Sequence, residues 1–508
     1  MRDRQPPSST FWSGRRKALA GLSAGAMAGV SLMAVPTGAA ADQELAPKIY
    51  TVTPSSEPGQ ITGPSSVKVW DAATHTLTKE VPIPATRPGT TATSDDGISK
   101  PHHFMVLHDR NIGLVMGFSP SSDIKVFDLV KDEFIEGTDD SPDGKRFTIE
   151  TGTKFDDPNL PARFSGAGPR HLEMHPSGDI AYSANFDGDS FSAIDLNTLK
   201  EIKTVPVGDR PNYVDYVETA AGPRLFVANF GENYLSVFDA NTYEPVRTPA
   251  APDGKVTVGK NGVAGPFNMG VSHDQNYVMS ADAKSNTVTF VDTKTLEVTS
   301  VVDIGGDHRT DLPAAAFQRL NPRISPEGRW LWIGNQDASE TTIIDIEKQE
   351  KVKAIPSGLG ADLMFFPLGP AEGYAFITNR YDKKVTVARL NGIRPPTYVG
   401  QIPTARIGSH YMTFDKSWET AIVSERPGRS YGVFDMTLFA NPNRGAVRRG
   451  LKNVEVQSIW TGGSSFDPNP EMWQPDYSDD YTRAGQDMAV YVWFENGIAQ
   501  VSKERGGD

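Results

Sequence analysis

A short strand that recurs along the chain constrains its fold more than any other feature. Each copy alternates apolar with polar or small residues and ends in Asp, as in Leu235–Asp239. The other copies are Val67–Asp71, Ile124–Asp128, Phe191–Asp195, Val288–Asp292, Thr342–Asp345 and Tyr431–Asp435, with Val385–Arg389 in the same place but without Asp. The copies are roughly 45 to 65 residues apart, which is the length of a four-stranded propeller blade.

A second strand precedes the repeated one and ends in Asn, and a turn and an outer strand follow it. Examples of the preceding strand are Ile180–Asn185, Leu225–Asn229, Leu331–Asn335 and Tyr374–Asn379. Helical periodicity is almost absent from the chain. We therefore predict an all-β protein that forms a single β-propeller of four-stranded blades.

The two ends of the chain predict how the ring closes. Only a third strand at Val67 and a fourth strand at Thr78–Ile83 precede the first complete repeat. Met488–Trp493 and Ile498–Val501 have the pattern of the missing first and second strands. A blade built from both termini leaves no open sheet edge, and it brings the count to eight blades. A seven-bladed ring with one spare hairpin is the alternative.

The first 41 residues predict export of the chain. Arg15–Lys17 are a charged start, Ala18–Val35 is a Gly- and Ala-rich apolar stretch, and Ala39–Ala41 provides a cleavage site. The arginine pair resembles a twin-arginine signal, and an ordinary secretory signal is the alternative. We expect residues 42–508 to be a periplasmic or extracellular propeller domain. No later apolar run of about 18 residues could insert it into a membrane.

Composition excludes several kinds of site. The chain has no cysteine and a formal net charge of −13. Without cysteine there can be no disulfide, thiol nucleophile, iron–sulfur cluster or covalently attached haem c. The acidic balance argues against nucleic acid or an anionic membrane surface as the main partner. Any metal must be held by His, Asp, Glu, Met, Tyr or water.

The first strands of the blades should bring distant residues together, because in a propeller they surround a central channel. Aligning these strands on their Pro or Gly starts places one residue of each blade at the same level, at the mouth of the channel. In ring order these residues are His103, His171, Tyr213, Asn268, Asn321, Asp362, His410 and Asp487. The whole chain has nine histidines, and three of them fall in this set.

In an eight-bladed ring, four potential metal ligands of this set are consecutive: His410, Asp487, His103 and His171. Three imidazoles and a carboxylate suit copper or zinc. His102 and Arg170 adjoin two of these ligands, and we predict catalytic or substrate-facing roles for them and for Asp362. The alternative is that all these side chains only bind water and cap neighbouring strands.

The repeats resemble the YVTN-repeat and cytochrome-d1-like propeller family across essentially the whole of residues 42–508. His102-His103 and Gly168–His171 also resemble the start of blades in the copper-dependent thiocyanate dehydrogenase family. This second resemblance implies that His103, His171 and His410 bind copper. It implies further that Asp487 or Asp362 is a ligand or base, and that Arg170 clamps an anion. Because Asn268 and Asn321 stand where a multi-copper centre needs imidazoles, no particular substrate follows.

The expected function is therefore that of a secreted oxidoreductase that uses copper, or zinc as the alternative metal, to act on a small molecule or anion. The resemblance implies that copper accepts electrons and activates water, and an external electron acceptor is a further expected partner. A lactonase-like hydrolase, in which a His and an acidic residue activate water, is a second interpretation. A non-catalytic propeller that binds a ligand or a surface is a third.

Overall fold

The structure is a computed structural model that describes residues 47–53, 66–84, 101–107, 110–117, 123–135, 148–151, 168–305, 320–336, 338–415, 417–425, 430–460 and 490–493. For some of these residues, among them His102, His103 and Arg170, only the backbone is described. The predicted signal, residues 1–41, lies outside the described residues, so export remains a prediction.

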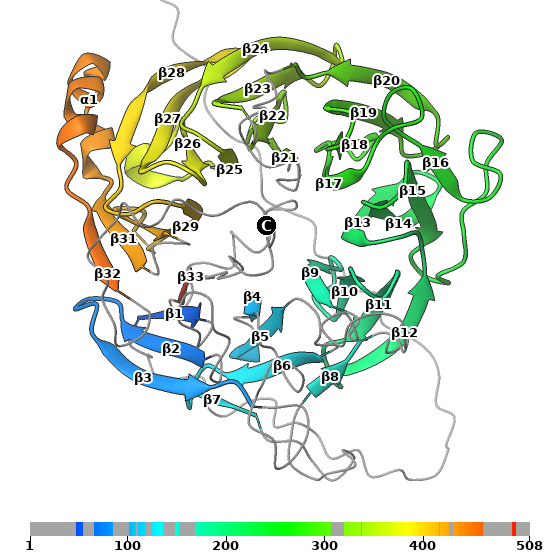
Figure 1. The fold of residues 1–508 in the computed structure, drawn as a ribbon, viewed down its shortest axis with the longest axis horizontal. Coiled ribbons are helices and arrows are strands. Elements are labelled where there is room, and N and C mark those ends of the chain that lie inside the picture. The colour runs from blue at the N-terminus through cyan, green and yellow to red at the C-terminus, as the bar shows by residue number, and fades with distance from the viewer. Residues whose placement is uncertain are drawn as a thin grey trace, which may run out of the picture. The chain divides into compact units, whose positions relative to one another are not determined.

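Eight antiparallel sheets form the eight blades of a ring, and Figure 1 shows them following one another around it. Blade 1 consists of β33 (Val490–Trp493), β1 (Lys48–Thr53), β2 (Ser66–Asp71) and β3 (Leu77–Pro82). Blade 2 consists of β4 (Pro101–Leu107), β5 (Ile112–Gly117), β6 (Asp123–Asp128), β7 (Glu133–Phe134) and β8 (Thr148–Glu150). Blade 3 consists of β9 (Pro169–Met174), β10 (Ile180–Asn185), β11 (Ser190–Asp195) and β12 (Lys200–Pro206).

The remaining blades follow in chain order. Blade 4 has β13 (Pro211–Thr219), β14 (Gly222–Asn229), β15 (Tyr234–Asp239) and β16 (Lys255–Thr257). Blade 5 has β17 (Pro266–Val271), β18 (Tyr277–Asp282), β19 (Thr287–Asp292) and β20 (Val298–Asp303). Blade 6 has β21 (Leu320–Ile324), β22 (Trp330–Asn335), β23 (Glu340–Asp345) and β24 (Glu350–Pro356). Blade 7 has β25 (Ala361–Phe365), β26 (Tyr374–Asn379), β27 (Lys384–Asn391) and β28 (Arg394–Pro403), and blade 8 has β29 (Ser409–Phe414), β30 (Thr420–Glu425), β31 (Ser430–Asp435) and β32 (Gln457–Trp460).

The eight-bladed, all-β ring confirms the predicted fold, and the seven-bladed alternative is wrong. The predicted assignment of strands in the closing blade needs one correction. The C-terminal region supplies the inner strand β33, as expected, but the second strand is β1, from the N-terminal side. The reason is that Lys48–Thr53 pairs with both β2 and β33, so it already occupies the place predicted for Ile498–Val501. Residues 498–501 lie outside the described residues.

The repeated Asp ends its strand by capping the turn that follows. In blade 3, Asp195 Oδ1 accepts hydrogen bonds from the backbone N–H of Asn197 (2.7 Å) and Thr198 (3.2 Å). Asp239 and Asp292 accept equivalent pairs of backbone bonds in blades 4 and 5. Such a side chain satisfies backbone donors that the turn leaves open. The repeated Asp of these blades is therefore a turn cap.

The hydrophobic core is divided among the spaces between neighbouring blades. One cluster joins Tyr182 and Phe191 of blade 3 to Leu225 of blade 4, and another joins Trp332 of blade 6 to Ile377 of blade 7. All five of these side chains are fully buried. Because each fully buried large apolar side chain contributes about 1.5 to 3 kcal/mol, the contacts between blades are a main source of stability.

One short insertion interrupts the all-β pattern. Between β31 and β32 lie the 3-10 turns η4 (Thr437–Ala440) and η5 (Leu451–Asn453) and the helix α1 (Arg444–Gly450), and a further 3-10 turn, η3 (Gly369–Ala371), precedes β26. Leu451 packs directly over Gly400 of β28, where a larger residue would collide with it. In the described part of the chain, no helix has the length and apolar character needed to cross a membrane.

Candidate functional site

The first residues of five consecutive inner strands form a chain of side-chain hydrogen bonds around the ring axis. Asn212 Nδ2 donates to Asn268 Oδ1 (2.8 Å), and Asn268 Nδ2 donates to Asn321 Oδ1 (2.6 Å). Asn321 Nδ2 donates to Asp362 Oδ1 (2.6 Å), and His410 Nδ1 contacts Asp362 Oδ2. We call these five residues the axial arc. It links blades 4 to 8, and its members in blades 5 to 8 are the residues that the alignment of inner strands predicts.

Asp362 is the most strongly held member of the axial arc. Its side chain is fully buried, and its Oδ1 accepts a second bond from Gln336 Nε2 (2.6 Å) in blade 6. Because an ionised carboxylate can only accept hydrogen bonds, His410 must donate its Nδ1–H to Oδ2. Both oxygens of the carboxylate are therefore engaged by side-chain donors.

The surroundings of Asp362 favour its charged form. Burial by itself raises the pKa of the Asp362 carboxyl, because it removes water from the charge. Burial is the largest single effect, but the charge and the hydrogen bond of His410 act against it and lower that pKa. The Arg380 charge and the Gln336 hydrogen bond lower it further, so the pKa of Asp362 lies below its ordinary value. A buried carboxylate that stays ionised is suited to orienting an imidazole and stabilising its protonated form.

Breaks in strand register turn the axial residues away from regular pairing. The pairing of β25 with β26 shifts between Ala361 and Met364, and that of β29 with β30 shifts between Ser409 and Met412. Asp362 and His410 lie inside these two irregularities. Similar shifts occur at the starts of β4, β9, β13 and β17. Bulges of this kind re-aim side chains and are frequent next to active sites.

A glycine allows the backbone at Asp362 to come close to its neighbour. Gly334, next to the end of β22, lies against the Asp362 carbonyl group, and a Cβ at Gly334 would overlap the carbonyl oxygen. Only a residue without a side chain can occupy that place while Asp362 keeps its position. Gly334 thus helps to position the backbone that carries the Asp362 carboxylate.

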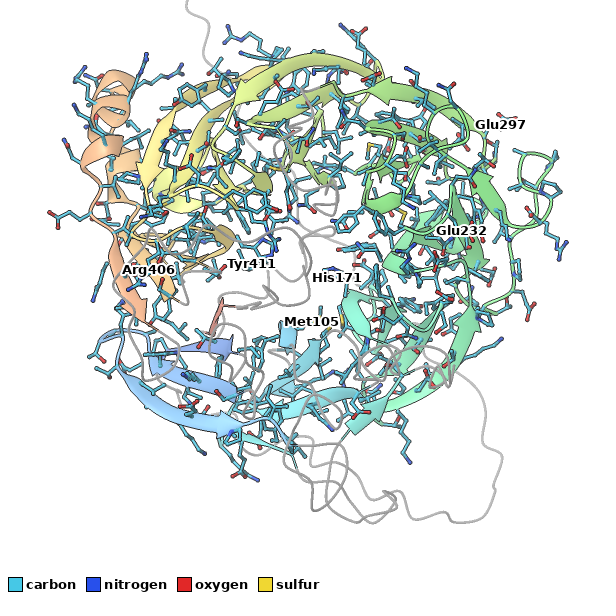
Figure 2. The ribbon with its side chains drawn as sticks, in the orientation of Figure 1. Met105, His171, Glu232, Glu297, Arg406 and Tyr411 are labelled. Atoms are coloured by element: carbon cyan, nitrogen blue, oxygen red, sulfur yellow. The ribbon has the colours of Figure 1, made fainter. Side chains whose placement is uncertain are left out.

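The other predicted site residues are only partly described. His171 lies on β9 at the inner edge of blade 3, as Figure 2 shows, and its ring lies 5.3 Å from that of Tyr213 in blade 4. Blades 1 and 2 stand between its blade and the blade of His410. The backbones of His102 and His103 in β4, and of Arg170 in β9, start their inner strands as predicted. The side chains of these three residues, and the whole of Asp487, lie outside the described residues.

The predicted metal ligands are therefore described only in part. Among the residues with described side chains, no group of three or more His, Asp or Glu is close enough together to hold a metal ion. The structure instead joins one predicted ligand, His410, to one predicted catalytic residue, Asp362. Figure 2 labels Tyr411, the residue after His410, at the inner edge of blade 8.

Sequence reasoning missed Asn212, Gln336 and Gly334. In blade 4 it chose Tyr213, which is buried against the core of blades 4 and 5, while Asn212 carries the hydrogen bond of the axial arc. Gln336 follows the Asn that ends β22, and comparison of residues at that place in each blade was the signal that could have found it.

Comparisons with known proteins agree with the fold. A family model described as "Lactonase, 7-bladed beta-propeller" matches residues 146–306, which span β8 to the end of β20. No curated protein sequence matches the chain. The dihydro-haem d1 dehydrogenase NirN has a similar structure with a TM-score of 0.52 at 12% identity, over 82% of this chain and 74% of that chain.

Two other solved structures are less similar. One is the hydrazine synthase of Kuenenia stuttgartiensis, with a TM-score of 0.42 and 18% identity over 58% of this chain and 87% of that chain. The other is a protein of Bacteroides uniformis described as a 6-phosphogluconolactonase, with a TM-score of 0.44 and 15% identity over 70% of this chain and 97% of that chain. This chain is thus an eight-bladed β-propeller whose blades 3 to 5 are similar in sequence to the lactonase propellers.

Proposed function

We propose that the protein is a hydrolase that opens a lactone, or a similar ester, at the ring axis. The observation that carries this proposal is the pairing of His410 with Asp362, a fully buried carboxylate whose pKa lies below its ordinary value. An imidazole held in this way is the usual general base for activating water or a nucleophile. The similarity of residues 146–306 to a lactonase family supports the choice of ester.

The chemistry follows from which nitrogen Asp362 engages. Asp362 accepts the Nδ1–H of His410, so the water proton would go to Nε2. As the water oxygen attacks the carbonyl carbon, the imidazole becomes a cation, and the Asp362 carboxylate stabilises that charge. The proton then passes from Nε2 to the leaving alkoxide, which opens the ring. His410 is 17% exposed, so water reaches its side chain.

Fixing Asp362 is part of the same function. Asn321 and Gln336 both donate to Oδ1, which leaves Oδ2 for the imidazole. An orienting carboxylate that cannot rotate holds the imidazole in one tautomer and one direction. The axial arc therefore supplies the rigid support that a general base needs.

The predicted copper oxidoreductase is a second candidate, and the same pair supports it. Histidines that bind metals usually donate their other ring N–H to a carboxylate, as His410 does to Asp362. A bound copper ion would supply redox chemistry and Lewis acidity. His103, His171, His410 and Asp487 would hold it, as predicted. The fit of the described side chains is partial, because Asp362 already uses both oxygens and His171 lies three blades from His410.

One experiment separates these candidates and the non-catalytic alternative. The purified protein is analysed for metals and then assayed with simple lactones before and after treatment with a chelator. The hydrolase proposal predicts ring opening that survives metal removal. Stoichiometric copper that is lost in His103→Ala and His171→Ala, without lactone hydrolysis, would establish the oxidoreductase candidate instead. If the protein contains no metal and hydrolyses no lactone, the non-catalytic propeller that binds a ligand or a surface is the remaining candidate.

A further inference from the structure

The Asp362 carboxylate determines the direction of every hydrogen bond in the axial arc. Because the carboxylate only accepts, Asn321 must turn its amide NH₂ group toward Asp362. Asn321 then offers its oxygen to Asn268, which must donate in turn and offers its own oxygen to Asn212. The orientation of each amide follows from this chain of donors. It leaves the oxygen of Asn212 as the last acceptor.

The same rule fixes the amide of Gln336. Its Nε2 must face the Asp362 carboxylate, so its Oε1 points away from that oxygen. Gln336 is 2% exposed, and its Oε1 is buried without a hydrogen-bond donor among the described residues. Asn212 Oδ1, at the far end of the axial arc, is also buried without a hydrogen-bond donor among the described residues. Two buried acceptors thus lack donors at the ring axis, in the part of the chain that the structure describes.

A buried acceptor without a donor costs free energy, so native proteins supply a donor from ordered water or from a ligand. The two acceptors differ in their distance from the proposed reaction. Gln336 binds the carboxylate that holds His410, whereas Asn212 is separated from it by Asn268 and Asn321. A hydroxyl group bound at Gln336 Oε1 would therefore lie next to the His410–Asp362 pair.

We propose that Gln336 Oε1 accepts a hydroxyl group of the ligand, so that the axial site selects hydroxylated small molecules over their unsubstituted equivalents. This proposal rests on the proposed function, whose substrate class it names. Both atoms of the Gln336 amide would then be used: Nε2 donates a hydrogen bond to Asp362, and Oε1 accepts one from the ligand. An ordered water molecule at Oε1 is the other source of a donor, and it would give no such selectivity.

The kinetic test uses two lactones with the same ring. D-Ribonolactone carries hydroxyl groups and γ-butyrolactone carries none, and spontaneous hydrolysis is subtracted for both. We expect wild-type kcat/KM to be at least about tenfold higher for D-ribonolactone. Gln336→Met should remove most of this preference, because methionine has a similar length but cannot accept the hydroxyl.

Asn321→Leu is the matched control. It removes the other hydrogen bond to Asp362 Oδ1, at the same 2.6 Å as that of Gln336, but leaves Gln336 Oε1 in place. We expect this variant to lose activity toward both lactones equally, so that the ratio between them stays at the wild-type value. A ratio that falls equally in both variants would overturn the proposal, because the effect would then come from Asp362 alone.

A binding test separates this proposal from the proposed hydrolysis. Anhydro-D-ribitol has the hydroxylated ring without the ester, and tetrahydrofuran has the bare ring. Binding of each to the wild-type protein and to Gln336→Met is measured by calorimetry or ligand-observed NMR. Stronger binding of anhydro-D-ribitol that is lost in Gln336→Met supports the proposal even when no lactone is hydrolysed. Hydrolysis of both lactones at equal kcat/KM, with no binding of anhydro-D-ribitol, would overturn it and leave the hydrolase intact.

Discussion

Two buried carboxylic acids of this protein show how local donors decide the charge of a residue. Asp362 faces the imidazole of His410, and the pKa of its carboxyl lies below the ordinary value. Asp282, at the end of β18, is also fully buried, but burial raises its pKa to about 7. Its partners are hydroxyl groups, including those of Ser280 (2.6 Å) and Thr289 (2.5 Å). Neutral donors offset only part of the loss of water.

Other blades place Asn where blade 5 has Asp282. Asn229 in blade 4 and Asn379 in blade 7 end the same strand and donate to a hydroxyl group on the next strand, Ser236 or Thr386. An uncharged amide thus fills this place without a burial penalty for charge. Asp282 is therefore a position at which the native residue lowers stability at neutral pH.

We predict that Asp282→Asn stabilises the protein in a pH-dependent way. The folded-state pKa is about 7 and the ordinary value is 3.8, so wild-type stability falls as pH rises between them and stays low above. Near pH 4 the variant should gain little, and at pH 8 it should gain up to about 4 kcal/mol. Urea unfolding at both pH values measures this. Asn229→Asp is the matched reverse change, and equal pH dependence in all three proteins would contradict the prediction.

At the residue scale, the sequence located most of the axial arc. Asn268, Asn321, Asp362 and His410 were placed at one level because an inner strand brings one residue of each blade to the axis. Asn212 was not identified, because the alignment on Pro211 selects Tyr213, whose side chain packs in the core between blades 4 and 5. The hydrogen bond from Gln336 to Asp362 was not predicted either. Which donor reaches a buried carboxylate depends on the packing between blades, and the repeat pattern does not encode that packing.

At the scale of the strand, close approach between blades positions the site. Gly334, next to the end of β22, lies against the Asp362 backbone, whereas Gly270 in β17 has its nearest side-chain neighbours at 3.7 Å from a Cβ placed there. The two glycines, in neighbouring blades, therefore differ in their steric surroundings. There is no room for a side chain at Gly334, whereas a Cβ at Gly270 would make only ordinary van der Waals contacts.

We expect Gly334→Ala to disturb the site and Gly270→Ala to be tolerated. The added methyl group at Gly334 must push the Asp362 carbonyl away, which should cost about 1 to 3 kcal/mol and lower lactone hydrolysis. Urea unfolding and the hydrolysis assay measure the two effects. The prediction fails if both alanine variants behave alike.

Strand types and turn caps were predictable because they depend on local alternation and on the Asp that ends each third strand. The second strand of blade 1 was not identified, because residues 54–65 separate it from β2, whereas the same two strands of blade 3 are joined by residues 186–189. Because no short turn joins β1 to β2, the sequence gives no local signal that these two strands pair. On its other edge, β1 pairs with β33 from the other end of the chain.

At the scale of the whole molecule, this pairing closes the ring. β33 joins β1 in blade 1, with Lys48 opposite Trp493 and Thr51 opposite Val490. It also contacts the inner strands β29 and β4 of the two neighbouring blades. A ring without β33 would expose the inner edge of β1 and weaken two contacts between blades.

We therefore predict that deleting residues 490–508 lowers the thermal unfolding temperature and promotes self-association. The open edge of β1 would pair with other chains, so the effect should grow with protein concentration. Thermal unfolding and analytical ultracentrifugation measure both consequences. An unchanged unfolding temperature and a monomeric truncated protein would show that β33 does not hold the ring closed.

The number of blades and their order were predictable for the whole molecule, because eight repeats of similar length leave few ways to close a ring. The chemistry at the axis was not predictable to the same degree. It depends on which of the inner residues face each other across blades, and the structure answers this for blades 4 to 8 through the axial arc.

The central claim is that Asp362 makes His410 a general base. Its most direct test is kcat for lactone opening by metal-depleted wild type, Asp362→Asn and Asp292→Asn. Asp292 is the control because it caps a turn in blade 5. We predict that Asp362→Asn loses about a hundred- to ten-thousand-fold in kcat with its fold intact, while Asp292→Asn keeps the wild-type kcat. Full activity in Asp362→Asn would contradict the account.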